Sequence, residues 1–181
     1  MRKANISLIG FRATGKSTVG RILAEELRWP FFDMDQRLAE SFGGEIKDWV
    51  REHGWESFRR AESDLLQALA LRERIVVATG GGVILEMANR ETLKKRFYNV
   101  WLTASPELLF RRLTADPKTQ SDRPALTSLS LLEEIIQTLR ERHAHYEAAA
   151  DLVMDTERTT AAELAAAIRK TVDTWDFSDS G

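Results

Sequence analysis

The sequence predicts an α/β protein in which a parallel β-sheet lies between two layers of helices. Short apolar runs of the β-strand type alternate along the chain with longer segments of helical periodicity. Because parallel strands need crossover connections, the helical segments are expected to cover the faces of the sheet. The predicted strands are 6–9, 31–32, 75–78, 100–102 and 152–154. The predicted covering helices are 17–27, 57–71, 87–97, 129–150 and 160–175.

Residues 10–18 carry the first chemical signal, between the first predicted strand and the first predicted helix. They read GFRATGKST and match the pattern G-x-x-x-x-G-K-[ST]. The backbone N–H groups of such a loop, together with the positive end of the helix dipole, bind a polyphosphate. Lys16 is expected to reach the β- and γ-phosphates, and the Ser17 hydroxyl is expected to bind Mg²⁺. The alternative is a glycine turn with a chance lysine.

Two carboxylates, Asp33 and Asp35, follow the second predicted strand. At the carboxyl end of a parallel strand, both can reach the crevice where α/β proteins bind ligands. One could orient water ligands of a bound Mg²⁺, and the other could accept a proton from the hydroxyl group of an acceptor. The alternative is that Asp35 is only the N-cap of a helix over 36–40.

Arg59 and Glu62 are spaced i, i+3 on a predicted helix. Glu62 could therefore orient the Arg59 guanidinium as a bidentate clamp for a carboxylate or a phosphate. Arg60 and Glu56 form an equally good candidate for a solvated surface pair.

Gly80, Gly81 and Gly82 directly follow the most apolar predicted strand, 75–78. Three consecutive residues without Cβ indicate that something approaches the backbone closely. We favour contact with a ligand over a simple sharp turn.

The segment 114–128 is polar and lacks an apolar period, which predicts a mobile loop between two helices. Loops of this kind often act as lids, although an ordinary surface loop is the alternative. Arg123 lies in this segment, where lid closure could bring it to a transferring phosphoryl group. Arg142 lies late in the helix predicted over 129–150. Either arginine could instead be a solubilising surface residue.

The order and content of these motifs resemble the shikimate kinase family over residues 6–171. The matching motifs are the phosphate loop at 10–18, D-x-D at 33–35, F-R-x-x-E at 58–62, G-G-G at 80–82, R-P-x-L at 123–126 and R-x-x-x-Y at 142–146. The resemblance implies a three-layer P-loop kinase fold with a five-stranded parallel sheet, a substrate-binding helical region over 33–71 and a lid over 113–126. The family commonly has proline at the position of Ala144.

The resemblance implies ATP-dependent phosphorylation of the 3-hydroxyl of shikimate, with Mg²⁺, in aromatic amino-acid biosynthesis. It implies catalytic roles for Lys16, Asp35 and Arg123, and places Ser17 and Asp33 at the metal. The implied ATP contacts are Ala13, Thr14, Gly15, Lys16, Ser17, Thr18, Arg123 and Arg158. The implied shikimate contacts are Asp35, Arg59, Gly80, Gly81, Gly82 and Arg142.

Two other functions remain open at this point. Gluconate kinases and other small-acceptor kinases share the phosphate loop, and arginines bind phosphates as well as carboxylates. The gluconate kinases lack this combination of the aspartate pair with the triple glycine. A nonenzymatic nucleotide-binding regulatory domain could use the same fold. The presence of Lys16, Ser17, Asp33, Asp35 and Arg123 argues against that reading.

The composition favours a small-molecule ligand. The 181 residues suit a single domain over 1–181, with a flexible tail at 176–181. A net charge of −2 without long basic blocks gives no sign of nucleic acid or an anionic membrane as a partner. The absence of cysteine excludes disulfides and thiolate chemistry. We therefore expect a cytoplasmic monomer that binds a small molecule, which the resemblance to the family implies is shikimate.

Overall fold

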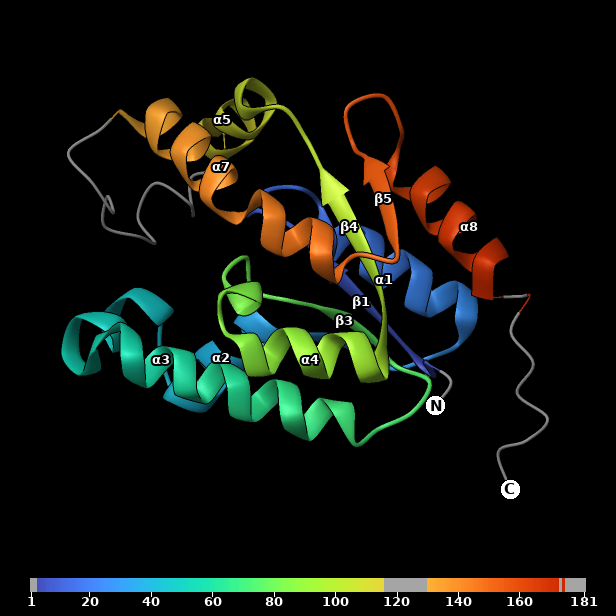
Figure 1. The fold of residues 1–181 in the computed structure, drawn as a ribbon, viewed down its shortest axis with the longest axis horizontal. Helices are drawn as coiled ribbons and strands as arrows, with labels where there is room; N and C mark the ends of the chain where they lie inside the picture. The colour runs from blue at the N-terminus through green and yellow to red at the C-terminus, as the bar shows by residue number, and fades with distance from the viewer. Residues whose placement is uncertain (1–2, 116–129, 173, 175–181) are drawn as a thin grey trace.

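The computed structural model describes residues 3–115, 130–172 and 174. Five parallel strands form one sheet in the order β2-β3-β1-β4-β5 (Figure 1). The strands are β1 (Asn5–Ile9), β2 (Phe31–Asp33), β3 (Val76–Ala78), β4 (Phe97–Thr103) and β5 (Leu152–Asp155). The predicted five-stranded parallel sheet is therefore confirmed. Phe97, predicted as the end of a helix, begins β4 instead, because its side chain is fully buried in the core of the sheet.

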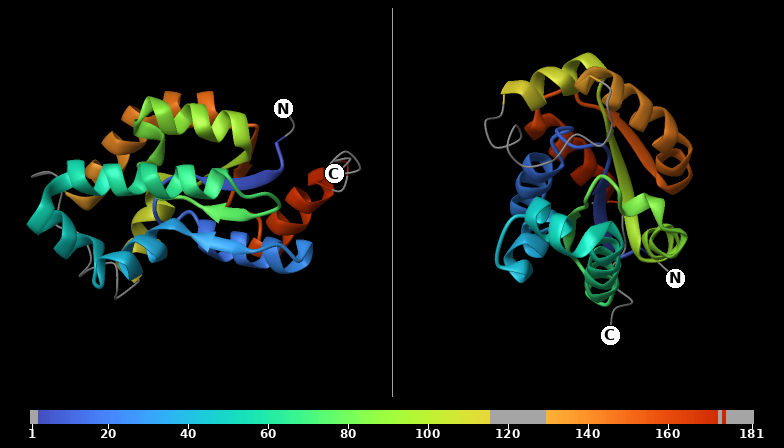
Figure 2. Two further views of the ribbon diagram at one scale, coloured as in Figure 1. Left: turned by 90° about the horizontal axis from the view of Figure 1, so that it is seen from below. Right: turned by 90° about the vertical axis from the view of Figure 1, so that its left-hand side faces the viewer.

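Helices cover both faces of the sheet and give the three predicted layers (Figure 2). One face packs against α1 (Lys16–Leu27) and α8 (Ala161–Val172). The other face packs against α3 (Ile46–Ala70), α4 (Met87–Arg96) and α7 (Leu131–Ala149). The apolar stripe predicted on the last helix is buried at Leu164, Ile168 and Val172, whereas Trp175 lies outside the described residues.

Three shorter helices complete the described part of the fold: α2 (Met34–Phe42), the 3₁₀ turn η1 (Val83–Leu85) and α5 (Pro106–Ala115). The predicted helix 57–71 is the second part of a longer element. Its first part begins at Ile46, and the two parts meet in a kink at Gly54, where φ is 81°. No helix among the described residues is long and apolar enough to cross a membrane.

The strand register brings the functional loops to one edge of the sheet. Asp33 on β2 lies opposite Ala78 on β3, and Ala78 lies opposite Leu8 on β1. The loop after β1, the aspartates at and just beyond the end of β2, and the glycines after β3 therefore lie side by side at this edge. In parallel α/β sheets, ligands bind at this carboxyl edge.

A separate apolar cluster packs the phosphate loop against α5 and α7. Phe11 of the loop is buried with Leu109 and Leu113 of α5 and with Ile135 of α7. Apolar burial of this kind fixes the loop in place without occupying its polar inner face.

Candidate active site

The phosphate loop encloses one end of a cavity of about 560 Å³. The loop starts at Gly10 and ends at Gly15, which caps the N-terminus of α1 with φ at 92°. The cavity is lined by residues 12–19 together with Asp33, Asp35, Thr79, Arg112, Thr156, Thr159, Ala161 and Leu164. Backbone N–H groups at a helix start favour anions, so the geometry suits the predicted polyphosphate site.

The Lys16 side chain is buried within the loop. Its ammonium group donates to the carbonyl oxygen of Gly10 at 3.0 Å and to that of Phe11 at 2.7 Å. These two carbonyls hold the positive charge inside the loop.

Contacts with two helices that are distant in the sequence, α5 and α7, hold the phosphate loop. Arg112 on α5 donates to the Ala13 carbonyl at 3.0 Å and to both the hydroxyl and the carbonyl of Thr156 at 3.1 Å. Arg12 forms an ion pair of 3.3 Å with the buried carboxylate of Glu134 on α7. Ala13 itself adopts the left-handed conformation, with φ at 62°, which is uncommon for alanine.

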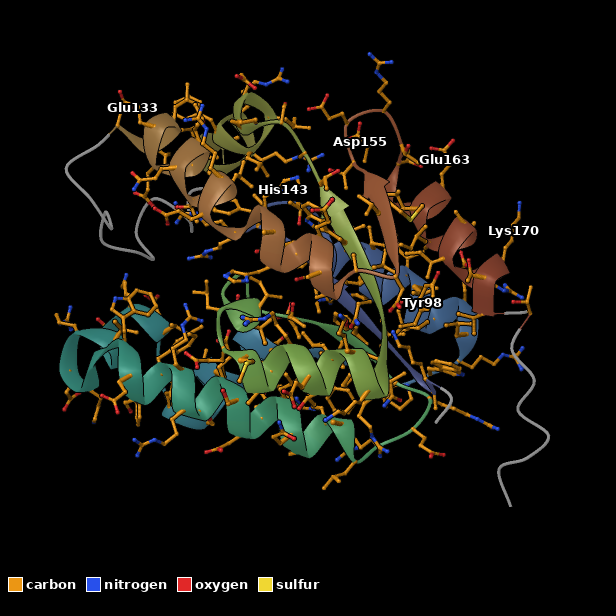
Figure 3. All side chains as sticks on the ribbon, in the orientation of Figure 1. Tyr98, Glu133, His143, Asp155, Glu163 and Lys170 are labelled. Carbon is orange, nitrogen blue, oxygen red and sulfur yellow. The ribbon has the colours of Figure 1, made fainter. Side chains whose placement is uncertain are left out.

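The same cavity is also lined by the turn between β5 and α8, the turn that Asp155 and Glu163 flank in Figure 3. The Ser105 backbone N–H donates to Glu157 at 2.8 Å, and hydrogen bonds from Ser105 lower the pKa of the Glu157 carboxyl. Arg158 in this turn is exposed and is absent from the cavity lining, unlike Thr156 and Thr159. Its contact with the nucleotide stays a prediction.

Asp33, and not Asp35, caps the N-terminus of the helix that follows β2. One Asp33 oxygen accepts from the Gln36 backbone N–H at 3.2 Å, so Asp33 is the N-cap of α2. The other oxygen accepts a hydrogen bond from the Ser17 hydroxyl. The N-cap alternative for Asp35 is therefore wrong, because α2 starts two residues earlier than the interpretation required.

A second cavity, of about 300 Å³, opens on the other side of Asp35. It is lined by Asp35, Trp55, Phe58, Arg59, Glu62, Gly80, Gly81, Gly82, Leu85 and Arg142. Asp35 belongs to the lining of both cavities. A carboxylate therefore stands at the boundary between a phosphate-binding loop and a pocket that contains two arginines.

The Arg59 guanidinium is fixed in this second cavity. It donates to Glu62 at 2.5 Å, and the Glu62 side chain is almost fully buried. The aromatic rings of Trp55 and Phe58 lie 5.5 Å and 5.1 Å from the Arg59 Cζ atom. By contrast, Arg60 and Glu56 form an exposed surface pair at 3.3 Å.

Arg142 and Tyr146, one turn apart on α7, both bond to a single carbonyl oxygen. Arg142 donates to the Gly81 carbonyl at 3.0 Å, and the Tyr146 hydroxyl donates to it at 2.5 Å. The Tyr146 ring stacks on Trp101 of β4, and His143, labelled in Figure 3, meets the same indole edge-on. Because Arg142 and Tyr146 are spaced i, i+4, their two hydrogen bonds connect α7 to the triple glycine. These bonds form although residue 144 is alanine instead of the proline common in the family.

A family model described as shikimate kinase matches residues 12–173. The chain belongs to the shikimate kinase family.

Individual family members match most of the chain. A shikimate kinase of Nitratidesulfovibrio vulgaris is 43% identical over 145 residues, which cover 80% of this chain and 82% of that protein. Shikimate kinase 2 of Dickeya chrysanthemi is 42% identical over 157 residues, or 87% of this chain and 90% of that protein. Among solved structures, the shikimate kinase from Acinetobacter baumannii in complex with shikimate has a TM-score of 0.86 at 33% identity, and the match covers 94% of this chain and 93% of that one.

The structure brings most of the residues implied by the family resemblance into these two adjoining cavities. The phosphate-loop residues, Asp33 and Asp35 line the first, and Asp35, Arg59, the three glycines and Arg142 line the second. Arg123 and the rest of the predicted lid beyond residue 115 lie outside the described residues, as does the predicted tail at 176–181. Arg112 and Glu134 were not singled out from the sequence, and Tyr146 was named only as the last residue of the R-x-x-x-Y motif.

The Tyr146 hydroxyl leads to a prediction about alkaline stability. Burial raises its pKa from 10.0 to about 12, although Arg142 opposes the shift. The folded chain thus keeps this proton at pH values where the unfolded chain loses it. The resulting stabilisation, roughly 2 to 3 kcal/mol, is complete below pH 10 and disappears as the pH rises toward 12.

We expect the free energy of unfolding of the wild type to fall relative to that of the Tyr146→Phe variant as the pH rises from 10 to 12. Chemical denaturation of both proteins at several pH values measures this difference. Tyr98, the other tyrosine of the chain, is common to both proteins and cancels. A difference that does not change with pH contradicts the prediction.

Proposed function

We propose that this chain transfers the γ-phosphoryl group of ATP to the 3-hydroxyl of shikimate, giving shikimate 3-phosphate and ADP. The observation that carries this proposal is the position of Asp35 in the lining of both cavities. An acceptor hydroxyl held beside Asp35 in the smaller cavity faces the phosphate loop. Phosphoryl transfer needs mainly this positioning, together with neutralisation of the phosphate charge.

The phosphate loop and its neighbours form the nucleotide half of the site. Backbone N–H groups bind the phosphates, and Lys16 moves from the two loop carbonyls to the β- and γ-phosphates. Ser17 and Asp33 present adjacent oxygen atoms, the donor type that Mg²⁺ prefers. A bound Mg²⁺ supplies charge neutralisation at the phosphates. Thr14, Gly15 and Thr18 complete this half, and we assign Arg123 to the transferring group.

The smaller cavity forms the acceptor half. Arg59 and Arg142 bind the carboxylate of shikimate, and Asp35 orients the hydroxyl and accepts its proton. The rings of Trp55 and Phe58 contact the apolar part of the acceptor. The membership of the family and the shikimate complex of the Acinetobacter relative support this assignment.

The decisive experiment compares acceptors. We expect ADP release from ATP and Mg²⁺ with shikimate, and none above background with gluconate, AMP or CMP. Chelation of the divalent cation should abolish turnover. Preference for another acceptor would assign the site to a different small-acceptor kinase, and nucleotide binding without turnover of any acceptor would indicate a regulatory domain.

The Arg59→Ala variant tests the acceptor half in the same assay. Each charge-assisted hydrogen bond to the carboxylate is worth about 1.5 to 3 kcal/mol, so the KM for shikimate should rise at least about tenfold. The KM for ATP should stay near the wild-type value. Arg60→Ala, which removes the exposed neighbouring arginine, is the matched control.

A further inference from the structure

We infer that Gly80 and Gly82 are positioning residues, because their missing side chains leave the space in which Asp35, Glu62 and Arg59 are held. Backbone conformation does not explain why glycine occupies these positions. The described glycines with positive φ are Gly10, Gly15, Gly43 and Gly54, so the triple glycine has φ values open to other residues. The explanation must therefore come from what surrounds these Cα atoms.

Gly82 provides the surface against which the Arg59 guanidinium packs. A Cβ atom on Gly82 would lie 2.5 Å from Nη1 and 2.6 Å from Cζ of Arg59, closer than side chains approach in proteins. The guanidinium is held in this position by its bond to Glu62 and by the flanking rings of Trp55 and Phe58. A methyl group at residue 82 would therefore displace Arg59.

Gly80 provides the space in which two carboxylates converge. A Cβ atom on Gly80 would lie 2.5 Å from Oε1 of Glu62 and 2.9 Å from Oδ1 of Asp35. Asp35 comes from α2 and Glu62 from α3, so Gly80 fixes how closely these two elements bring their acidic groups together. A methyl group at residue 80 would displace one carboxylate or both.

Gly81 differs from its two neighbours. A Cβ atom there would meet the Arg12 backbone nitrogen and the Gly10 carbonyl oxygen at 3.5 Å, an ordinary contact distance. The role of Gly81 lies in its carbonyl oxygen, which accepts the hydrogen bonds from Arg142 and Tyr146. Gly80 and Gly82 thus act through their missing side chains, and Gly81 acts through its carbonyl oxygen.

Alanine substitutions distinguish a positioning role of Gly80 and Gly82 in the site from a general role in stabilising the fold. The atoms that a new methyl group would meet are the ends of side chains, so the fold can yield while the site changes. The kinetic effects expected for these variants rest on the proposed function, because they are measured with shikimate as the acceptor. Gly82→Ala should raise the KM for shikimate at least about tenfold with kcat within about threefold, and Gly80→Ala should lower kcat at least about tenfold.

The control variant is Gly44→Ala. Residue 44 lacks positive φ, and a Cβ atom there meets nothing within 4 Å, so its kinetics should equal those of the wild type. The unfolding midpoints of Gly80→Ala and Gly82→Ala should stay within about 4 °C of the wild type. Loss of folding in these two variants would overturn the inference.

A double-mutant cycle tests whether Gly82 acts through Arg59. If it does, Gly82→Ala has no further effect on KM in an Arg59→Ala background, whereas independent effects would add. Additive effects, or an unchanged KM in Gly82→Ala alone, overturn the inference. A crystal structure of Gly82→Ala gives a readout that needs no acceptor: a displaced guanidinium supports the inference even if shikimate is not the substrate, and an unmoved one overturns it.

Discussion

Asp35→Asn should lower kcat for shikimate phosphorylation by about 10² to 10⁴, the usual contribution of a general base. The substitution keeps the size of the side chain and one acceptor oxygen, but it replaces the other oxygen with an NH₂ donor and removes the ability to accept the hydroxyl proton. Because the proton is accepted only in the transition state, the loss should appear in kcat rather than in the KM for ATP. Steady-state kinetics with both substrates varied measures this.

Asp48→Asn is the matched control for this variant. Asp48 also lies in the first turn of a helix, but it is half exposed and pairs with Arg51 on the surface of α3. Both substitutions remove a negative charge near a helix N-terminus and should cost a similar 0.3 to 1 kcal/mol of stability, on the order expected for a helix dipole. A kcat for Asp35→Asn within threefold of the control would show that proton acceptance at Asp35 does not contribute to the reaction.

The parts of the site that could be predicted are those that a short stretch of sequence defines. The phosphate loop is a single stretch of nine residues, and its chemistry follows from glycine, lysine and hydroxyl spacing between a strand and a helix. Arg59 and Glu62 are neighbours on one helical turn, so their ion pair follows from i, i+3 spacing. In both cases the sequence separation is small enough for local geometry to fix the contact.

The groups that hold these parts in place could not be predicted, because their contacts join distant segments. Arg112 reaches the Ala13 carbonyl across 99 positions of the chain, and Arg12 reaches Glu134 across 122. On sequence alone each of these side chains looks like an ordinary charged residue of a helix surface or loop. Only the packing of α5 and α7 beside the phosphate loop distinguishes them.

The aspartate pair shows a different reason for an incomplete prediction. Both residues could be placed near the carboxyl edge of the sheet, but their roles depend on where α2 begins. A boundary shift of two residues moves the capping role from Asp35 to Asp33 and leaves Asp35 in the first turn, between the cavities. Helix ends are set by small differences in capping energy, so a pattern of spacing does not resolve them.

Lys16→Met should reduce kcat about 10² to 10³-fold, because it removes a positive charge aimed at the group that is transferred. The substitution should change the free energy of unfolding only slightly, because one unfavourable effect and one favourable effect nearly cancel. The carbonyls of Gly10 and Phe11 lose a donor, but the folded chain no longer buries an ammonium group. The variant should therefore unfold close to the wild-type midpoint, yet gain less thermal stabilisation from ADP and Mg²⁺.

Thermal unfolding with and without nucleotide, alongside steady-state kinetics, measures both effects. The control is Lys95→Met, which removes an exposed lysine. Equal stabilisation by nucleotide in Lys16→Met and in the wild type would place the Lys16 charge outside the nucleotide site.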